Sequence, residues 1–121
     1  MLDKFGIQVD WNREEQLLQV PGNQNFQAQN YTVEGDYSQS AFFLGAAALG
    51  NPVKSYGLNL DSKQGDKAVL DILDQLGAPV KQVDDYLTVE NPQLKGGGTI
   101  DGSQCPDIIP MVSLVAALSP G

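Results

Sequence analysis

The strongest helical pattern in the chain covers residues 66–76, where apolar side chains recur at spacings of three and four residues. Gly77 follows the last of them, and glycine is the usual residue just past the C-terminal end of a helix. The positions that share the apolar face are Val69, Ile72, Leu73 and Leu76. The pattern therefore predicts a helix over residues 66–76 that ends at Gly77.

Two further helices are predicted from capping residues. Asp36 or Ser38 can cap a helix over about residues 38–49. Gly50 is then placed to end it. A third helix is predicted to begin near Pro106, because the missing N–H of proline costs nothing in the first turn.

Short runs of alternating or β-branched residues predict strands between these helices. Residues 5–20 are interpreted as a helix end followed by two short strands, and residues 21–30 as a polar loop. The other predicted strands are residues 31–34, 53–58, 80–83, 86–89 and the glycine-broken stretch 94–100. One unit is then strand–helix–strand–helix–strand–strand, which predicts an α/β protein of the α+β type. Crossover connections in such a unit imply parallel pairing in part of each sheet.

The chain also repeats itself. The stretch LDKFGIQV at residues 2–9 recurs 71 residues later as LDQLGAPV, and a short alternating run follows each copy. Two further matches keep the same order: DYSQ at residues 36–39 with DGSQ at 101–104, and AAL at 47–49 with AAL at 116–118. Because the order is kept while the offsets drift slightly, the matches predict a structural unit of about 70 residues.

The second copy indicates what the first one lacks. A full helix is predicted before Gly77, whereas only five residues precede Gly6, fewer than a stable helix needs. Residues 1–5 are therefore interpreted as the last turn of a helix whose earlier turns lie upstream of Met1. This interpretation predicts that the chain is a piece of a longer protein.

Composition and charge narrow the classes of function. The chain has 121 residues, 41% of them hydrophobic, and no apolar run long enough to span a membrane, so a soluble globular protein is expected. With 15 Asp and Glu against 7 Lys and Arg, the net charge of −8 disfavours binding to nucleic acid. There is no histidine and only one cysteine, Cys105, so neither an intrachain disulfide nor an ordinary zinc site is expected.

Asp107 is the first candidate for chemistry. It follows Pro106 in DGSQCPDIIP, so it lies in the first turn of the predicted helix, where the helix dipole favours a carboxylate. The residues alone leave two interpretations open: Asp107 caps its own helix, or it orients a substrate hydroxyl in a cleft. The neighbouring Cys105 is interpreted as a partly buried thiol, since there is no histidine to activate it as a nucleophile.

Two other segments are interpreted structurally. VEGDYSQSAFF at residues 33–43 is predicted to be a turn from a strand into a helix, with Phe42 and Phe43 as core residues or domain contacts. Residues 95–99 are glycine-rich but lack the Gly-Lys-Ser/Thr ending of a phosphate-binding loop. They are interpreted as a flexible loop.

These motifs resemble the EPSP synthase family. The resemblance rests on VEGDYSQSAFFLGAAALG, SKQGDKAVLDILDQLGA and DGSQCPDIIPMVSLVAAL, whose order and spacing fit and which cover most of the chain. It implies repeated βαβαββ units in the inverse α/β barrel-like fold of the enolpyruvyl transferases, with the active site between two domains. Residues 1–33 would finish the first domain, residues 34–92 would form the first unit of the second domain, and residues 93–121 would begin the next unit.

The resemblance also implies a reaction. Members of the family transfer the enolpyruvyl group of phosphoenolpyruvate to the 5-hydroxyl of shikimate 3-phosphate and release phosphate, without a metal or an organic cofactor. The family's aspartate at the position of Asp107 contacts the target hydroxyl, so the same role is expected of Asp107. Asp36 and Gln104 lie in recognisable family segments and are expected to be neighbours of the site rather than catalysts.

The chain departs from the family in what it lacks. The lysines, arginines and Ser-Ser-Gln segment that hold the two anionic substrates in the family lie outside these 121 residues, and Arg13 is the only arginine. Phosphorylated carboxylates need such cations, and a net charge of −8 would repel them. We therefore expect this piece alone to be inactive.

Two alternatives stay open. One is the sibling enzyme that transfers enolpyruvate to UDP-N-acetylglucosamine, although the sequences VEGDYSQSAFF and CPD fit that enzyme less well. The other is a non-enzymatic interaction module with the same repeated core, which a fold alone does not exclude. The absence of a targeting signal favours the cytoplasm, and unpaired strand edges could drive self-association.

Overall fold

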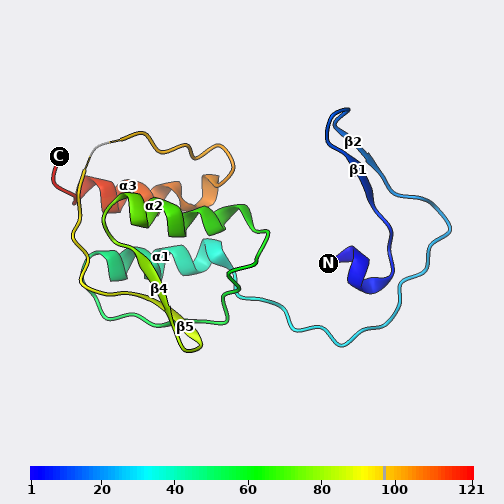
Figure 1. Cartoon of the computed structure of the whole chain (residues 1–121), viewed down its shortest axis with the longest axis horizontal. Helices are drawn as coiled ribbons and strands as arrows, with labels where there is room; N and C mark the ends of the chain where they lie inside the picture. The colour runs from blue at the N-terminus through cyan, green and yellow to red at the C-terminus, as the bar shows by residue number, and fades with distance from the viewer. Residues whose placement is uncertain (97) are drawn as a thin grey trace. The chain divides into compact units, whose positions relative to one another are not determined.

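The computed structural model describes residues 1–96 and 98–121 (Figure 1). The chain divides into two compact parts, unit 1 (Met1–Val33) and unit 2 (Glu34–Gly121). Each is described by itself below. The assignment of residues 1–33, 34–92 and 93–121 to units of two enzyme domains stays a prediction.

Unit 1 is a helical turn followed by a hairpin (Figure 1). The turn is the 3₁₀ helix η1 (Leu2–Phe5), and Gly6 ends it in the left-handed conformation with φ 76°. Strands β1 (Asp10–Asn12) and β2 (Leu17–Gln19) pair antiparallel. The predicted helix end, the two strands and the irregular loop over residues 21–30 are therefore confirmed.

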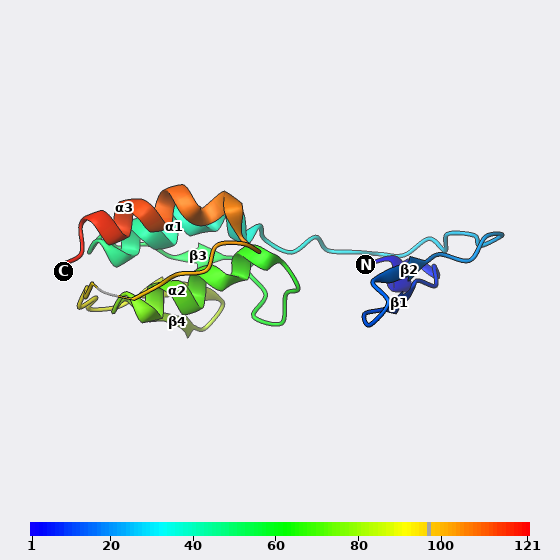
Figure 2. The same cartoon turned by 90° about the horizontal axis from the view of Figure 1, so that it is seen from above.

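Unit 2 is built on three helices that all begin at the same end of the unit (Figures 1 and 2). Two of them are entered through a short 3₁₀ turn, where the backbone tightens before the α-helix starts. The elements are α1 (Tyr37–Ala48), η2 (Gly65–Ala68) leading into α2 (Val69–Gln75), and η3 (Pro106–Ile108) leading into α3 (Ile109–Ala117). All three predicted helices are confirmed.

The sheet of unit 2 has three strands in the order β3-β5-β4. They are β3 (Ser55–Tyr56), β4 (Val80–Val83) and β5 (Tyr86–Val89), and β5 pairs antiparallel with both neighbours. The predicted bounds of β4 and β5 are confirmed. The expected parallel pairing is wrong for the described residues: β3 and β4 run in the same direction with α2 between them in the chain, but β5 lies between them in the sheet.

Two of the predicted strands do not form, and one is shorter than predicted. Residues 31–34 have no strand assignment, and the Gly35 amide that follows them bonds the carbonyl of Gly57 at 2.7 Å. Of residues 94–100, those that the structure describes are irregular, while Gly97 lies outside the described residues. There the Lys95 amide bonds the carbonyl of Leu76 at the end of α2. The strand predicted over residues 53–58 is reduced to Ser55–Tyr56.

The repeat found in the sequence is visible in the backbone. Gly6 and Gly77 both end a helical turn in the left-handed conformation, with φ 76° and 84°. The Gly6 amide bonds the carbonyl of Asp3 at 3.0 Å, and the Gly77 amide bonds the carbonyl of Asp74 at 2.9 Å. An antiparallel hairpin follows in each copy. The similar sequences at residues 2–9 and 73–80 therefore adopt the same kind of helix end, and an antiparallel hairpin follows each of them.

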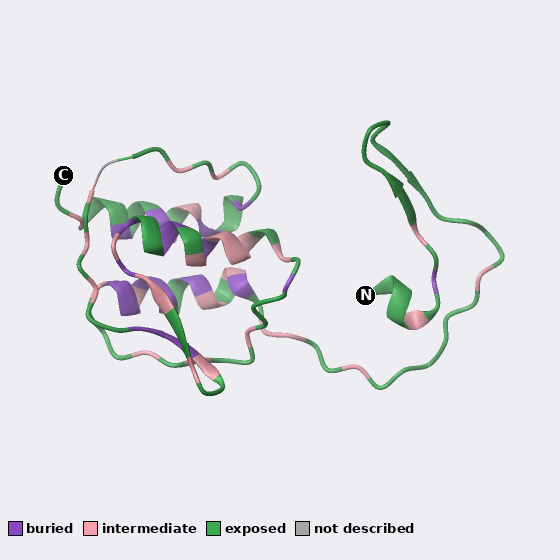
Figure 3. Ribbon diagram, viewed as in Figure 1, coloured by how far each residue is buried: buried purple, intermediate pink, exposed green. Residues whose placement is uncertain are grey.

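The core of unit 2 lies between the three helices and β5, where Figure 3 shows the buried positions. The largest fully buried side chains are Tyr37, Leu44, Leu73, Ile108, Val69, Val115 and Cys105. Phe42 and Phe43 are not among them, because their side chains are 52% and 62% exposed. Their interpretation as core residues is therefore wrong within this chain, and their role as domain contacts stays a prediction.

We expect Leu73→Ala to lower the free energy of unfolding by about 2–5 kcal/mol, because it leaves a cavity at a fully buried site. Leu114→Ala is the matched control: Leu114 is 56% exposed, so its truncation should change stability by less than about 0.5 kcal/mol. Urea denaturation followed by circular dichroism gives both values. Equal losses in the two variants would contradict the described core.

Candidate functional site

The first turns of α1, η2 and η3 contact one another at the end of unit 2 where the helices begin (Figure 2). Each of these turns carries or adjoins one carboxylate: Asp36 before α1, Asp66 in η2 and Asp107 in η3. Burial raises the pKa of Asp66, and the negative charges of Asp107 and Asp36 raise it further. The fold therefore brings Asp36 and Asp107 within electrostatic range of Asp66, although the three residues lie far apart in the sequence.

Asp36 is the N-cap of α1. Its Oδ1 accepts hydrogen bonds from both the amide and the hydroxyl of Ser38, each at 2.8 Å. The Ser38 hydroxyl and amide, which favour the ionised carboxylate, hold the pKa of Asp36 below its ordinary value. Of the two residues predicted as possible caps, Asp36 is therefore the one that caps α1. Its carboxylate is hydrogen-bonded to the first turn of that helix.

Asp107 lies in η3, directly after Pro106, and its side chain is exposed. The N-cap of this turn is Cys105, which makes no side-chain capping bond. In the part of the chain that the structure describes, the Asp107 carboxylate itself has no hydrogen bond of the kind that Asp36 makes with Ser38. Its carboxylate is therefore open to solvent at a helix start, where the positive end of the helix dipole favours negative charge.

Gln104 precedes η3 in the chain and lies against the start of η2. Its side chain is exposed, and its backbone carbonyl lies so close to Gly65 that a Cβ there would stand 2.4 Å from the Gln104 oxygen. Gly65 is the first residue of η2 and adjoins Asp66. The missing side chain of Gly65 thus allows the segment before Asp107 to pack against the start of η2.

Cys105 is buried, with 2% of its surface exposed. Burial raises the pKa of its thiol, and the charges of Asp66 and Asp101 raise it further. A neutral, buried thiol is not a nucleophile. Cys105 is therefore a buried thiol as expected, although it is fully rather than partly buried.

Asp66 is the member of the cluster that the sequence did not predict. It lies in the predicted helix 66–76 and in the family-like segment SKQGDKAVLDILDQLGA, but the sequence pattern assigned it no role there; its place in the cluster comes from the contact between η2 and η3. The acidic first turn of a helix that begins beside Gly65, within that segment, is the signal that could have pointed to it.

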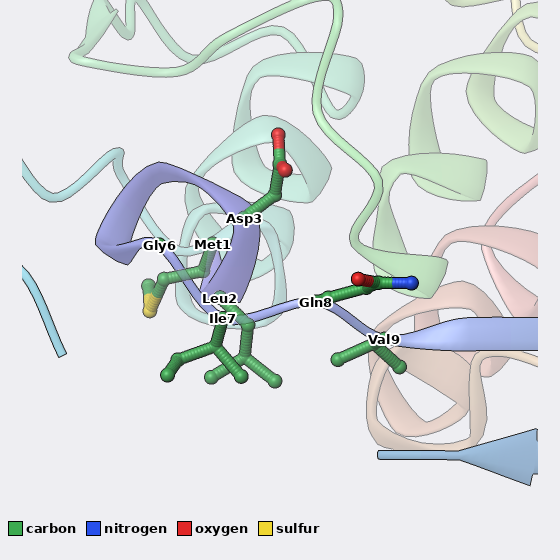
Figure 4. Close-up of a pocket in the computed structure, with 7 residues that line it drawn as sticks. All are labelled: Met1, Leu2, Asp3, Gly6, Ile7, Gln8 and Val9. Carbon is green, nitrogen blue, oxygen red and sulfur yellow. The ribbon is translucent and has the colours of Figure 1, made fainter. Parts of the chain in front are cut away.

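A pocket among the described residues belongs to unit 1 and is not this site (Figure 4). It has a volume of about 680 Å³ and is lined by residues 1–3 and 6–9. In Figure 4, Met1, Leu2 and Ile7 point to one side of the ribbon, while Asp3 points away. The pocket is an open apolar surface without converging polar groups. Within residues 1–96 and 98–121, no group of three His, Cys, Asp or Glu side chains is placed to hold a metal ion.

The sequence model of EPSP synthase, 3-phosphoshikimate 1-carboxyvinyltransferase, matches residues 1–121. The chain belongs to the EPSP synthase family. Its mixed helix and sheet structure fits an α/β domain fragment of this family. Among the described residues, every helix is too short or too polar to cross a membrane.

Curated relatives support the same family. The 3-phosphoshikimate 1-carboxyvinyltransferase of Clostridium perfringens (strain SM101 / Type A) is 45% identical over 122 residues, which cover 100% of this chain and 28% of the relative. That of Clostridium beijerinckii is 48% identical over 117 residues, covering 97% of this chain and 27% of the relative. The chain therefore spans little more than a quarter of the length of the curated relatives that it matches.

We expect Gly65→Ala to lower the free energy of unfolding by about 1–3 kcal/mol, because the added methyl group would overlap the backbone of Gln104. Gly22→Ala is the control, since a Cβ at Gly22 would meet nothing within 4 Å. Chemical denaturation of both variants measures the difference. A Gly65→Ala variant as stable as Gly22→Ala would contradict the close approach.

The Asp36 cap should make stability depend on pH. Because its folded-state pKa is below the ordinary value of 3.8, the ionised cap stabilises the fold above that pH, and this contribution is lost as the pH falls through the lower, folded-state pKa. The side-chain amide oxygen in the Asp36→Asn variant can accept the same bonds without titrating. We expect wild type to lose stability relative to this variant as the pH falls below 3.8, in thermal melts at a series of pH values. Parallel curves would contradict the assignment.

Proposed function

We propose that the chain forms one wall of the active site of a 3-phosphoshikimate 1-carboxyvinyltransferase. The reaction moves the enolpyruvyl group of phosphoenolpyruvate to the 5-hydroxyl of shikimate 3-phosphate and releases inorganic phosphate, a step of the shikimate pathway that leads to chorismate and the aromatic amino acids. Family membership supports the reaction class. The single structural observation that supports the site is the exposed Asp107 carboxylate among three converging helix starts.

Asp107 is the proposed catalytic residue. An exposed carboxylate at a helix start can accept a proton from, or a hydrogen bond of, the target hydroxyl. As the hydroxyl oxygen forms its bond to the enolpyruvyl group, its proton passes to the carboxylate, and the phosphate departs from the same carbon of phosphoenolpyruvate. Asp36 and Gln104 are proposed neighbours of the substrates. We propose Asp66 as a further neighbour, because η2, which carries it, contacts η3, which carries Asp107.

The same end of unit 2 also presents helix N-termini to the substrates. Free backbone amides at helix starts carry partial positive charge and attract anions. They cannot offset the negative charge of the chain, because three carboxylates lie at this end and the net charge is −8. We therefore propose that the cations that hold both phosphorylated substrates come from the rest of the longer enzyme, and that this chain alone is inactive.

The proposed enzyme works in the cytoplasm and takes no metal or organic cofactor. Its partners are the two small-molecule substrates. Self-association of the isolated chain stays a prediction. It is supported by large apolar side chains that are more than half exposed, namely Phe42, Phe43, Leu114 and Leu118.

The test of Asp107 uses the full-length enzyme that carries this segment. Asp107→Ala should lower the rate of phosphate release from phosphoenolpyruvate and shikimate 3-phosphate by about 100-fold or more, the scale of a missing general base. Asp85→Ala, which removes an exposed carboxylate from the turn between β4 and β5, should leave the rate unchanged.

The outcomes separate the interpretations. Full activity of a folded Asp107→Ala variant would leave Asp107 as a residue of the helix start only. Phosphate release by wild type with UDP-N-acetylglucosamine but not with shikimate 3-phosphate would replace the proposed substrate with that of the sibling enzyme. No phosphate release with either acceptor would favour an interaction module.

A further inference from the structure

One side chain, that of Gln64, holds the backbone at the start of unit 2. Its Oε1 accepts a hydrogen bond from the Tyr37 amide at 2.9 Å. Its Nε2 donates to the carbonyl of Gly35 at 2.9 Å and to Oε1 of Glu34 at 3.1 Å. Both ends of the amide are thus bonded to the segment that leads into α1.

Neighbouring contacts fix the same segment. The Ser62 hydroxyl donates to Oε1 of Glu34 at 2.9 Å and accepts a bond from the Gln64 amide at 3.2 Å. The Gly35 amide donates to the carbonyl of Gly57 at 2.7 Å. A Cβ at Gly35 would stand 2.9 Å from that same oxygen, so the two backbones approach as closely as glycine permits. The Gln64 bonds therefore belong to a small, partly buried network with a defined geometry.

The position of Gln64 links two members of the candidate site. Asp36 lies between Gly35 and Tyr37, the two residues whose backbones the Gln64 amide binds. Asp66 follows Gln64 by two residues, in the first turn of η2. The Gln64 side chain therefore ties the start of α1 to the start of η2, and with them Asp36 and Asp66.

We propose that Gln64 is a positioning residue for the candidate site: its side-chain amide sets the separation of the α1 and η2 starts, and so the placement of Asp36 and Asp66 beside η3, the turn that carries Asp107. This proposal rests on the function proposed above. Gln64 acts through other residues and touches no reacting atom. The requirement for one donor and one acceptor group makes glutamine specific here, because a carboxylate or a methyl group of similar size cannot supply both.

The first test measures the geometry in the 121-residue chain. In Gln64→Leu the Tyr37 amide loses its acceptor, so we expect its hydrogen exchange to quicken about five- to tenfold, as for the loss of one hydrogen bond. The Leu76 amide, bonded to the Ile72 carbonyl in α2, is the internal reference. Gln93→Leu is the matched control, because the Gln93 side chain is exposed and donates only to its neighbour Pro92. Unchanged Tyr37 exchange in Gln64→Leu would overturn the proposal.

The second test introduces a carboxylate at residue 64 of the full-length enzyme and measures kcat and KM. In Gln64→Glu, residue 64 can still accept from Tyr37 but no longer donates to Gly35 or Glu34, and it places a second carboxylate beside Glu34. We expect kcat to fall about tenfold, as for the loss of a hydrogen bond to a charged group, with a smaller change in KM. The double variant Glu34→Gln with Gln64→Glu removes the repulsion between the two carboxylates and restores a donor–acceptor pair between residues 34 and 64, but not the bond to the Gly35 carbonyl, so it should recover part of that loss. Gln93→Glu should retain wild-type kcat.

The outcomes distinguish this proposal from the proposed function. Wild-type kcat in Gln64→Glu, or an equal loss in the single and double variants, would overturn the positioning role. Recovery of kcat in the double variant, with KM little changed, would tie the loss to the pairing of residues 34 and 64. If Asp107→Ala were fully active, the proposed function would fail, whereas the Tyr37 exchange would still decide what Gln64 holds in place.

Discussion

The close packing of α1 against α3 is the constraint on which the rest of unit 2 depends. At Gly45 in α1, an added Cβ would stand 2.5 Å from Sδ of the buried Met111 in α3, so the helices touch where one has no side chain. Ala41 and Ala48 are also buried along α1. Small residues on one helix allow a short distance to the next. This packing fixes the helix starts, and the helix starts carry the carboxylates.

Bringing three carboxylates to one end of a domain is unfavourable unless something offsets their repulsion. Here the positive ends of helix dipoles and access to solvent both do so. The carboxylates nevertheless experience different surroundings. Ser38 lowers the pKa of Asp36, whereas burial and two like charges raise the pKa of Asp66. The cluster therefore contains one carboxylate that is stabilised in its ionised form and one whose ionisation is opposed by its neighbours.

The sequence was most informative where local rules decide the structure. The helix over residues 66–76 and the hairpin of β4 and β5 follow from apolar spacing and from glycine, and these need no knowledge of distant contacts. The strands predicted over residues 31–34 and 94–100 failed because a strand exists only where a neighbour pairs with it. Asp66 and Gln64 were missed for a related reason. Their roles arise from contacts with Asp107 and with Glu34–Tyr37, which no local pattern encodes.

The repeat explains why Asp36 and Asp107 differ in their local hydrogen bonding. In both copies an aspartate accepts the amide of a serine two residues later: Asp36 from Ser38 at 2.8 Å, and Asp101 from Ser103 at 2.9 Å. In the first copy this turn leads directly into α1, so Asp36 is its cap. In the second copy η3 begins only at Pro106, after the turn is complete. Asp107 therefore lies in the first helical turn but is not its N-cap. The same Asp–Ser turn thus caps a helix in one copy, through Asp36, and stands apart from the helix start in the other, where Asp101 occupies it.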